Sequence, residues 1–519
     1  MHVNPFRISF RPLLFLLCSL FVLLPGPSPA KPADLIPATQ LPTQFLFAVP
    51  GSRPARQAEY LSPRALFLIH YDTSGYHAVP ADYTFHPEIP DYVYCAARYL
   101  EDSYRVLHDS LGFSLPPADS AGDPEIDVYF TYNSDIYGET YPETQAETQV
   151  WTSYIHINSN LEDAARFYTT GLAGLQVTCA HELFHVFQLG YRYRSTDYFY
   201  FEMSSVWFEE YMYPEVNDYH YYFASYVANW NYALNHANLY YKNAGFNLYL
   251  DSRYSQSGNN VIHAIWERIR SVPALDAIAA EVQMHGGSMA QALSDWGSAQ
   301  VLCSSYAAAN FPYAFDDAAE LPGISFSRYP GNVIRKEEFG IKLPASPMTG
   351  YYRIPDLPEK KILLNFSFPE HMNVKLIALN GTQSRIYAME HSPLILDGAV
   401  YREWILSVGA TQSSDDSGIV HISVLQNDLI TAIAPNPSFT MANSELQYIL
   451  TETRGTGEFL LYDLRGRKLY GRSLPASLLN EGAHQLSLSG LPEPLASGIY
   501  IAVLKLDGRI LAKKLTYIK

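Results

Sequence analysis

Two histidines spaced four positions apart constrain this chain more than any other feature of its sequence. They stand in the stretch Cys179-Ala-His181-Glu182-Leu-Phe-His185-Val-Phe-Gln188. In an α-helix, residues i and i+4 lie on the same face, so both imidazoles can reach one metal ion. Glu182 is rotated from His181 by about 100° and can reach a water molecule on that ion. The motif therefore predicts a helix that carries a metal site.

The chemistry of these side chains favours zinc. The segment from about Leu172 to Leu189 has a strongly helical pattern. Imidazole and carboxylate ligands with one open coordination position are typical of a catalytic zinc site. Zinc lowers the pKa of its water to about 7, and Glu182 would then act as the general base. We therefore expect Zn2+ as the cofactor, with His181 and His185 as ligands.

The third protein ligand is expected in the acidic stretch Phe201-Glu-Met-Ser-Ser-Val-Trp-Phe-Glu-Glu210, because no histidine closely follows His185. If this stretch is helical, Glu202 and Glu209 share a face, since seven residues make nearly two turns. Glu202 as the ligand leaves Glu209 to orient a ligand histidine. The opposite assignment, with Glu209 as the ligand, is also open. Glu210 is rotated away from this face and is expected to be solvated.

The motif and the acidic stretch together resemble the gluzincin metallopeptidases. In that family His-Glu-x-x-His is followed by a loop and a helix whose first Glu binds zinc, usually within Glu-Gly-x-Ala. Glu202 matches this Glu, Ser205 stands in place of the Ala, and Met203 departs from the usual Gly. The resemblance implies a zincin-like catalytic domain of the α+β class with Glu202 as the third ligand.

The chain upstream of the motif is similar to a group of secreted bacterial metalloproteases of this class. The matching features are Phe67-Leu-Ile-His-Tyr71, Pro90-Asp-Tyr-Val93, Leu111-Gly-Phe113, Ile126-Asp-Val-Tyr129 and Tyr137-Gly138. A strand expected at Ser153 to Asn158 precedes the motif, where a metalloprotease would carry its substrate-pairing edge strand. The resemblance covers roughly residues 60 to 425.

Hydrophobic patterning divides the chain into a mixed part and a β-rich part. Strand and helix patterns occur together up to about residue 330, and short β-type runs separated by turns follow. The predicted fold class is a multidomain chain with an α+β, zincin-like domain followed by two all-β, sandwich-like modules. The expected segments are a signal peptide at 1–30, a leader or pro-segment at 31–60, the catalytic domain at 61–335, a β-sandwich at 336–428 and a second β-module at 429–519.

The first thirty residues have the layout of a cleaved secretory signal peptide. Arg7 and Arg11 form a basic region, Leu13 to Leu24 is almost entirely apolar, and Ser28-Pro29-Ala30 offers small residues before a cleavage point. About twelve apolar residues are too few to span a bilayer. No later segment reaches the length of a membrane span, so we expect no transmembrane segment in the mature chain.

The last ninety residues resemble the C-terminal sorting domain of proteins exported by the type IX secretion system. The matching features are Ala434-Pro-Asn-Pro437, Leu461-Tyr-Asp-Leu-Arg-Gly-Arg467, Leu495-Ala-Ser-Gly-Ile-Tyr500 and the basic ending Ala512-Lys-Lys-Leu-Thr-Tyr-Ile-Lys519. The resemblance implies that the type IX machinery is a partner of this module. It also implies a Gram-negative source, with the protein secreted or attached to the cell surface.

Composition excludes several other classes of protein. With 48% apolar and 17% charged residues, most of the chain is neither disordered nor fibrous. The net charge of −17 argues against a general nucleic-acid binder. Cysteines Cys95, Cys179 and Cys303 remain after signal removal. They allow at most one disulfide, and all three can be small buried residues.

Tyrosine is unusually frequent, with 41 of 519 residues, and thirteen tyrosines fall between Tyr191 and Tyr241. Most of them are expected to serve packing or to line the rim of a cleft. A hydrolase also needs a hydrogen-bond donor for the oxyanion, and the candidates are Tyr191, Tyr211, Tyr254 and His263. The isolated histidines His70, His86, His108 and His156 are expected to be structural or exposed.

The function expected from these features is a secreted zinc metalloendopeptidase that acts on a protein or peptide substrate. Two alternatives remain open. One is a non-catalytic adhesin or glycan-binding protein on a degenerate protease scaffold, and the other is a zinc hydrolase acting on a non-peptide bond.

Overall fold

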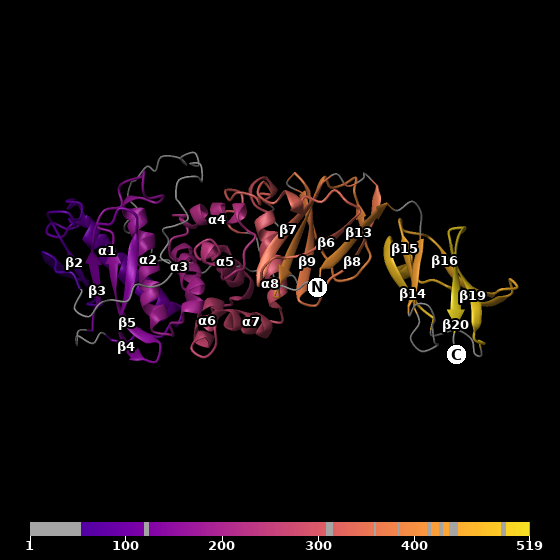
Figure 1. Ribbon diagram of the computed structural model, residues 1–519, viewed down its shortest axis with the longest axis horizontal. Helices are drawn as coiled ribbons and strands as arrows, with labels where there is room; N and C mark the ends of the chain where they lie inside the picture. Colours follow the sequence, from indigo (N-terminus) through magenta and orange to yellow (C-terminus); the bar gives the residue numbers. More distant parts are fainter. Residues whose placement is uncertain are drawn as a thin grey trace. The chain divides into compact units, whose positions relative to one another are not determined.

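A computed structural model describes residues 53–118, 124–307, 315–355, 357, 360–381, 383–412, 417–424, 429–434, 445–488 and 495–517 (Figure 1). The predicted signal peptide, most of the predicted leader and the Pro-Asn-Pro part of the C-terminal motif lie outside these residues. Among the described residues, no helix combines the length and apolar character that crossing a membrane requires.

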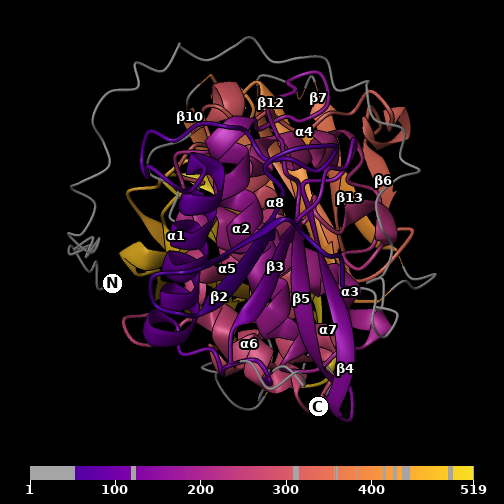
Figure 2. The ribbon, with the colours of Figure 1, turned by 90° about the vertical axis from the view of Figure 1, so that its left-hand side faces the viewer.

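A five-stranded sheet forms the first part of the described chain. Its strands are β1 (Ala58–Leu61), β2 (Phe67–Tyr71), β3 (Ile126–Phe130), β4 (Gly138–Glu147) and β5 (Val150–Ile157), in the order β1-β2-β3-β5-β4. Strands β2, β3 and β5 are parallel, whereas β1 and β4 pair antiparallel at the two edges. Helices α1 (Asp91–Arg105) and α2 (Gly171–Leu189) pack on this sheet (Figure 2).

The sheet departs from the sequence-based expectation at both edges. The strand expected at the edge before the motif is β5, and it lies inside the sheet between β3 and β4. The edge next to the motif helix is instead β4, which the sequence analysis did not identify because its polar residues conceal the alternation. Strand β1 begins at Ala58, inside the predicted leader, and pairs with β2.

Helix α2 is buried on nearly every side, which explains why its sequence is apolar all round rather than amphipathic. Its residues from Leu175 to Leu189 pack against the sheet, α1 and the next helix. Helix α1 is followed directly by a π-helical turn at Val106–Ser110. The motif therefore lies on an interior helix that packs against the sheet, α1 and α3.

A group of helices follows α2. They are α3 (Tyr198–Met212), α4 (Tyr219–Ala228), α5 (Ala244–Tyr254), α6 (Val261–Ile269), α7 (Ala274–Met284) and α8 (Met289–Val301). Helix α6 starts where the side chain of Asn260 accepts hydrogen bonds from the backbone N–H groups of Ile262 and His263. Helix α3 packs on α2, and α5 packs on both α3 and α8.

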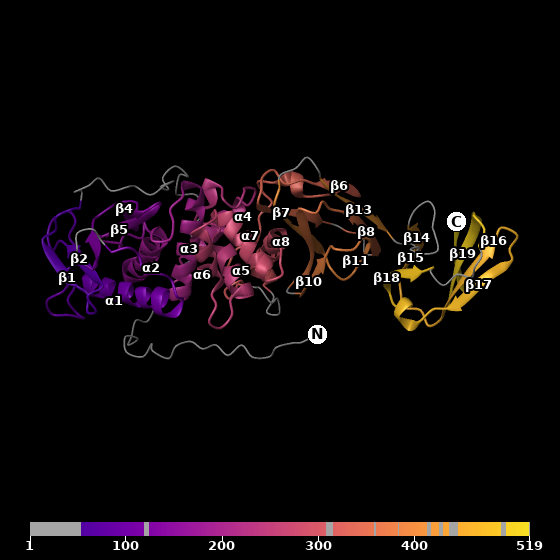
Figure 3. The same ribbon diagram turned by 90° about the horizontal axis from the view of Figure 1, so that it is seen from below.

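Two four-stranded antiparallel sheets follow the helices and enclose their own core (Figure 3). One has the order β10-β9-β12-β7, and the other has the order β11-β8-β13-β6. The strands are β6 (Glu338–Ile341), β7 (Met348–Pro355), β8 (Lys361–Ser367), β9 (Met372–Asn380), β10 (Gln383–Ala388), β11 (Leu394–Asp397), β12 (Glu403–Ala410) and β13 (Gly418–Val424). Trp404 and Leu406 of β12 are fully buried in this core.

Helix α8 packs directly on the sheet that contains β7, β9 and β12. The hydroxyl of Ser407 donates to the carbonyl oxygen of Ser294, and that of Thr349 donates to the carbonyl oxygen of Leu293. Gly409 allows this close approach, because a Cβ there would lie 2.0 Å from the carbonyl oxygen of Ala290. This sheet and the helical region therefore share one continuous core.

The remaining strands form a three-stranded and a four-stranded antiparallel sheet with a separate core. They are β14 (Leu429–Ala434), β15 (Glu445–Leu450), β16 (Gly457–Asp463), β17 (Lys468–Ser473), β18 (Gly482–Ser487), β19 (Gly498–Leu506) and β20 (Arg509–Tyr517). A turn at Gly466 joins β16 to β17, and its φ of +81° is one that glycine adopts easily. A mixed α/β region followed by all-β sheets agrees with the predicted class.

Candidate metal centre

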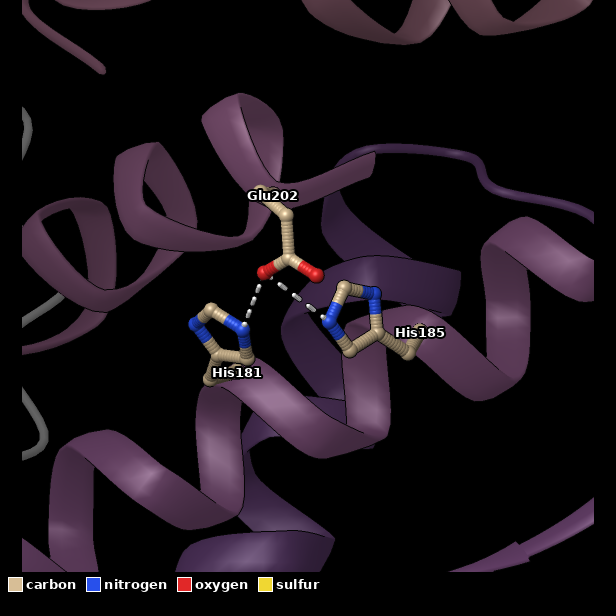
Figure 4. A group of neighbouring side chains, drawn as sticks. All are labelled: His181, His185 and Glu202. Atoms are coloured by element: carbon tan, nitrogen blue, oxygen red, sulfur yellow. Dashed lines mark hydrogen bonds and ion pairs between the residues drawn. The ribbon is translucent and has the colours of Figure 1, made fainter. Parts of the chain in front are cut away.

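Helix α2 presents His181, Glu182 and His185, and all three side chains are buried. Helix α3 crosses it and brings in Glu202, whose side chain is 1% exposed. The Nε2 atoms of His181 and His185 lie 3.2 and 3.6 Å from Oε2 of Glu202 (Figure 4). One ligand atom from each residue lies within 4.8 Å of the others, so this group could hold a metal ion.

The crossing of the two helices gives Glu202 and Glu209 different positions relative to the histidines. Oε1 of Glu209 lies 2.5 Å from Nδ1 of His181, on the side of the ring away from Glu202. Glu202 is therefore placed with the two histidines, and Glu209 is placed to orient one of them.

Hydrogen-bond partners fix the tautomers of both histidines. Burial raises the pKa of Glu209 to about 8, and when Glu209 is ionised it can only accept, so Nδ1 of His181 then carries the hydrogen. Nδ1 of His185 lies 2.7 Å from Oε1 of Gln188, and the amide nitrogen of Gln188 donates to the carbonyl oxygen of Phe201. Because that carbonyl can only accept, Oε1 must face His185, and Nδ1 of His185 is the donor.

When both rings are neutral, as metal binding requires, both Nε2 atoms therefore present lone pairs to the carboxylate of Glu202. Three acceptors that face one another at these distances repel unless a cation lies among them. A divalent metal ion relieves this repulsion, and imidazole with carboxylate is a donor set that suits zinc. The residues present therefore fit the metal that the motif predicts.

The same electrostatics appear in the pKa values of these groups. Burial alone would lower the pKa of His181, but the carboxylates of Glu202 and Glu209 outweigh it and raise that pKa well above 6.5. Burial acts to raise the pKa of Glu202, yet the two histidines hold it below its usual range. Without a metal ion, these residues therefore bind a proton at the position that a cation would occupy.

Glu182 is held between the motif helix and the edge strand. The hydroxyl of Thr140 on β4 donates to Oε2 of Glu182 at 2.7 Å. Gly138 on the same strand leaves no room for a side chain, because a Cβ would lie 2.7 Å from Cγ of Glu182. Burial raises the pKa of Glu182, which brings its basicity closer to that of a general base at neutral pH.

Tyrosines do border the centre, but they are not the predicted oxyanion donors. The ring of Tyr241 stacks on His181 with centroids 5.9 Å apart, and Tyr222 stacks on Tyr241. Burial and then the charge of Glu202 raise the pKa of both Tyr198 and Tyr241 well above 10, which places these two phenols beside that carboxylate. The sequence does not indicate that Tyr241 lies at this centre, because Tyr241 follows Glu202 by almost forty residues across two helices.

The four predicted donors have other neighbours. Tyr191 accepts a hydrogen bond from the backbone N–H of Ser114, His263 pairs with Glu267, Tyr211 is exposed beside Trp207, and Tyr254 packs against His285. None of them contacts the three ligand candidates among the described interactions. The isolated histidines His70, His86, His108 and His156 lie outside the metal group, as expected.

Glu210 differs from its expected solvated position. It is partly buried, and its pKa is raised to about 9 by burial and then by the charges of Asp317 and Glu209.

The described cysteines Cys95, Cys179 and Cys303 are free and buried, as small apolar residues would be.

Comparison with known proteins places no established activity on this chain. Residues 75–296, which include the candidate metal centre, match a model described as a family of unknown function, DUF6055. A search of curated proteins found no match.

Similar solved structures include bacterial glycosidases. A β-glucuronidase of Parabacteroides merdae has 9% identity over 33% of this chain and 27% of its own, with a TM-score of 0.20. A GH2 β-galacturonidase of Eisenbergiella tayi has 13% identity over 37% of each chain, with a TM-score of 0.20. A β-glucuronidase of Bifidobacterium dentium has 13% identity over 32% of this chain and 38% of its own, with a TM-score of 0.17. This chain therefore aligns with less than two fifths of each, and likeness at this level assigns neither fold nor activity.

Proposed function

We propose that this protein is a zinc-dependent metallopeptidase with a zincin-like catalytic domain. The observation that carries the proposal is the convergence of Nε2 of His181, Nε2 of His185 and the carboxylate of Glu202, with Glu182 adjacent on the same helix. His181, His185 and Glu202 would hold the ion. When bound, zinc supplies a Lewis acid that acidifies water and polarises the scissile carbonyl.

The remaining steps fall to the chain's own residues. Glu182 accepts the proton of the attacking water and passes it to the leaving amine. Thr140 keeps the Glu182 carboxylate turned toward the reaction. Tyr198 and Tyr241 are the candidates to donate a hydrogen bond to the developing oxyanion. Edge strand β4 supplies backbone groups with which an extended peptide can pair.

The test is a comparison of wild-type protein with Glu182→Gln. The substitution keeps the shape of the side chain but removes its basicity, so zinc content should stay near one per chain while hydrolysis of an unfolded protein substrate falls about 10²- to 10⁴-fold. Equal activity in both proteins contradicts the mechanism. A wild-type chain without stoichiometric zinc contradicts the metal centre and favours a non-catalytic binding protein.

We also propose that residues 1–30 direct export and that residues 429–519 engage the type IX secretion machinery. The support is the sequence resemblance of both ends. Deleting 429–519 should leave the protein inside the outer membrane of the native host, as cell fractionation would show. Normal release of the truncated chain contradicts this assignment.

A further inference from the structure

Gln188 lies on α2 one turn beyond His185 and is fully buried. Its side chain joins the two helices that build the metal centre. Oε1 accepts from Nδ1 of His185 at 2.7 Å, while Nε2 lies 3.2 Å from the carbonyl oxygen of Phe201 and from the hydroxyls of Ser204 and Ser205. These three acceptors flank Glu202 on α3, so one amide contacts both sides of the centre.

The surroundings of the amide leave it a single orientation. The hydroxyl of Ser204 donates to the carbonyl oxygen of Tyr200, so its oxygen is free to accept from Gln188 and from the indole N–H of Trp266. Turning the amide over would place Oε1 against the carbonyl oxygen of Phe201 and remove the hydrogen bonds that the amide nitrogen donates to this carbonyl and to the two serine hydroxyls. The serines therefore hold the amide, and the amide holds the ring of His185.

We infer that Gln188 is a positioning residue for the proposed metal centre, which fixes the Nε2 lone pair of His185 and sets the position of Glu202 relative to it. This inference rests on the proposed function. It differs from the role of Glu209, because the amide orients His185 without adding a further buried negative charge. It also gives Ser204 and Ser205 a role, since these buried hydroxyls accept hydrogen bonds from the amide.

The experiment measures the affinity of the full-length chain for Zn2+ by competition with a chromophoric chelator, together with the melting temperature of the metal-free protein. Gln188→Met keeps the volume but removes the acceptor and the donor, and should weaken zinc binding about 10- to 100-fold. Gln188→Glu restores an acceptor for Nδ1 of His185, and should bind zinc more tightly than the Met variant. Gln300→Met is the matched control, because Gln300 is equally buried but bonds Tyr351 on β7.

The expected order of affinity is wild type, then Gln188→Glu, then Gln188→Met, with Gln300→Met equal to wild type. Wild-type affinity in Gln188→Met overturns the inference. Equal losses in Gln188→Met and Gln300→Met also overturn it, since they indicate general destabilisation that the melting temperatures would mirror. A wild-type chain that binds no zinc is a distinct result, because it overturns the metal centre itself and the role of Gln188 with it.

Discussion

The hydroxyl of Thr140 on edge strand β4 donates at 2.7 Å to Oε2 of Glu182 on motif helix α2. This contact joins the edge of the sheet to the proposed general base, although the two residues are 42 positions apart in the chain. The orientation of Glu182 is therefore set by the sheet as well as by its own helix.

Replacing Thr140 by Val should lower kcat about 10- to 100-fold, because a hydrogen bond to a charged group contributes about 1.5–3 kcal/mol. Zinc content should not change, since Thr140 contacts none of the ligand candidates. Thr152→Val on β5 is the matched control, because Thr152 is buried and bonds Thr144 instead. A kcat equal to that of the control would show that Thr140 does not act on Glu182.

Adding a methyl group at Gly138 should displace Glu182. The new Cβ would lie 2.7 Å from Cγ of Glu182 and 2.9 Å from Cγ2 of Thr178, so at least one of them must move. We expect Gly138→Ala to reduce kcat strongly and to destabilise the fold by about 1–3 kcal/mol. Gly340→Ala on β6 meets its nearest atom at 3.5 Å and should have neither effect. Wild-type kinetics in Gly138→Ala would contradict the placement of Glu182.

Removing the hydroxyl of Tyr241 tests whether this residue, rather than the four donors expected from the sequence, stabilises the oxyanion. Tyr241→Phe keeps the ring stacked on His181, so zinc affinity should hold while kcat falls about 10²-fold or more. Tyr191→Phe is the control, because Tyr191 bonds Ser114. If Tyr191→Phe loses as much activity as Tyr241→Phe, the assignment is wrong.

The contact between α8 and the β-sandwich should be essential for folding of the helical region. Gly409→Ala places a Cβ 2.0 Å from the carbonyl oxygen of Ala290 and 2.7 Å from the amide of Ser294, and backbone atoms cannot rotate away. We expect a loss of about 3 kcal/mol or more in the free energy of unfolding, seen in urea titration. Gly323→Ala, with nothing within 4 Å, should match wild type. Equal stability of the two variants would mean that α8 does not depend on the sheet.

Stability should decline in mild acid because of His156. Burial, and then the charge of Arg56, lowers the pKa of His156 to about 4, and its Nε2 is buried with no hydrogen-bond partner among the described residues. The unfolded chain binds the proton near pH 6.5, so between pH 6.5 and 4 it holds more protons than the folded chain. The free energy of unfolding should therefore decrease as the pH is lowered through this window, by about 2 kcal/mol from pH 7 to pH 5.

His156→Phe tests this dependence, because the ring of His156 already packs against Tyr141 and Tyr154. Urea denaturation at pH 7 and at pH 5 should show a smaller difference in the variant than in wild type. His391→Phe, at an exposed position, should keep the wild-type difference. An unchanged pH dependence in His156→Phe would assign the acid sensitivity to other groups.

Local hydrophobic patterns predicted those helices and strands whose pattern lies within one continuous stretch of the sequence. The motif helix, expected from about Leu172 to Leu189, is α2 (Gly171–Leu189), and the strand expected at Ser153 to Asn158 is part of β5 (Val150–Ile157). The edge strand β4 was missed, because an edge strand exposes polar side chains and shows only a weak apolar alternation.

The sequence by itself determined that His181, Glu182 and His185 share one region of a helix, because the geometry of an α-helix relates residues three or four positions apart. It also limited the third ligand to two carboxylates on a second helix. Only the tertiary structure distinguishes their positions, since the crossing of α2 and α3 sets Glu202 beside both Nε2 atoms and Glu209 behind His181. The contacts of Thr140, Gln188 and Tyr241 likewise depend on how separate elements pack, and no spacing along the chain encodes that packing.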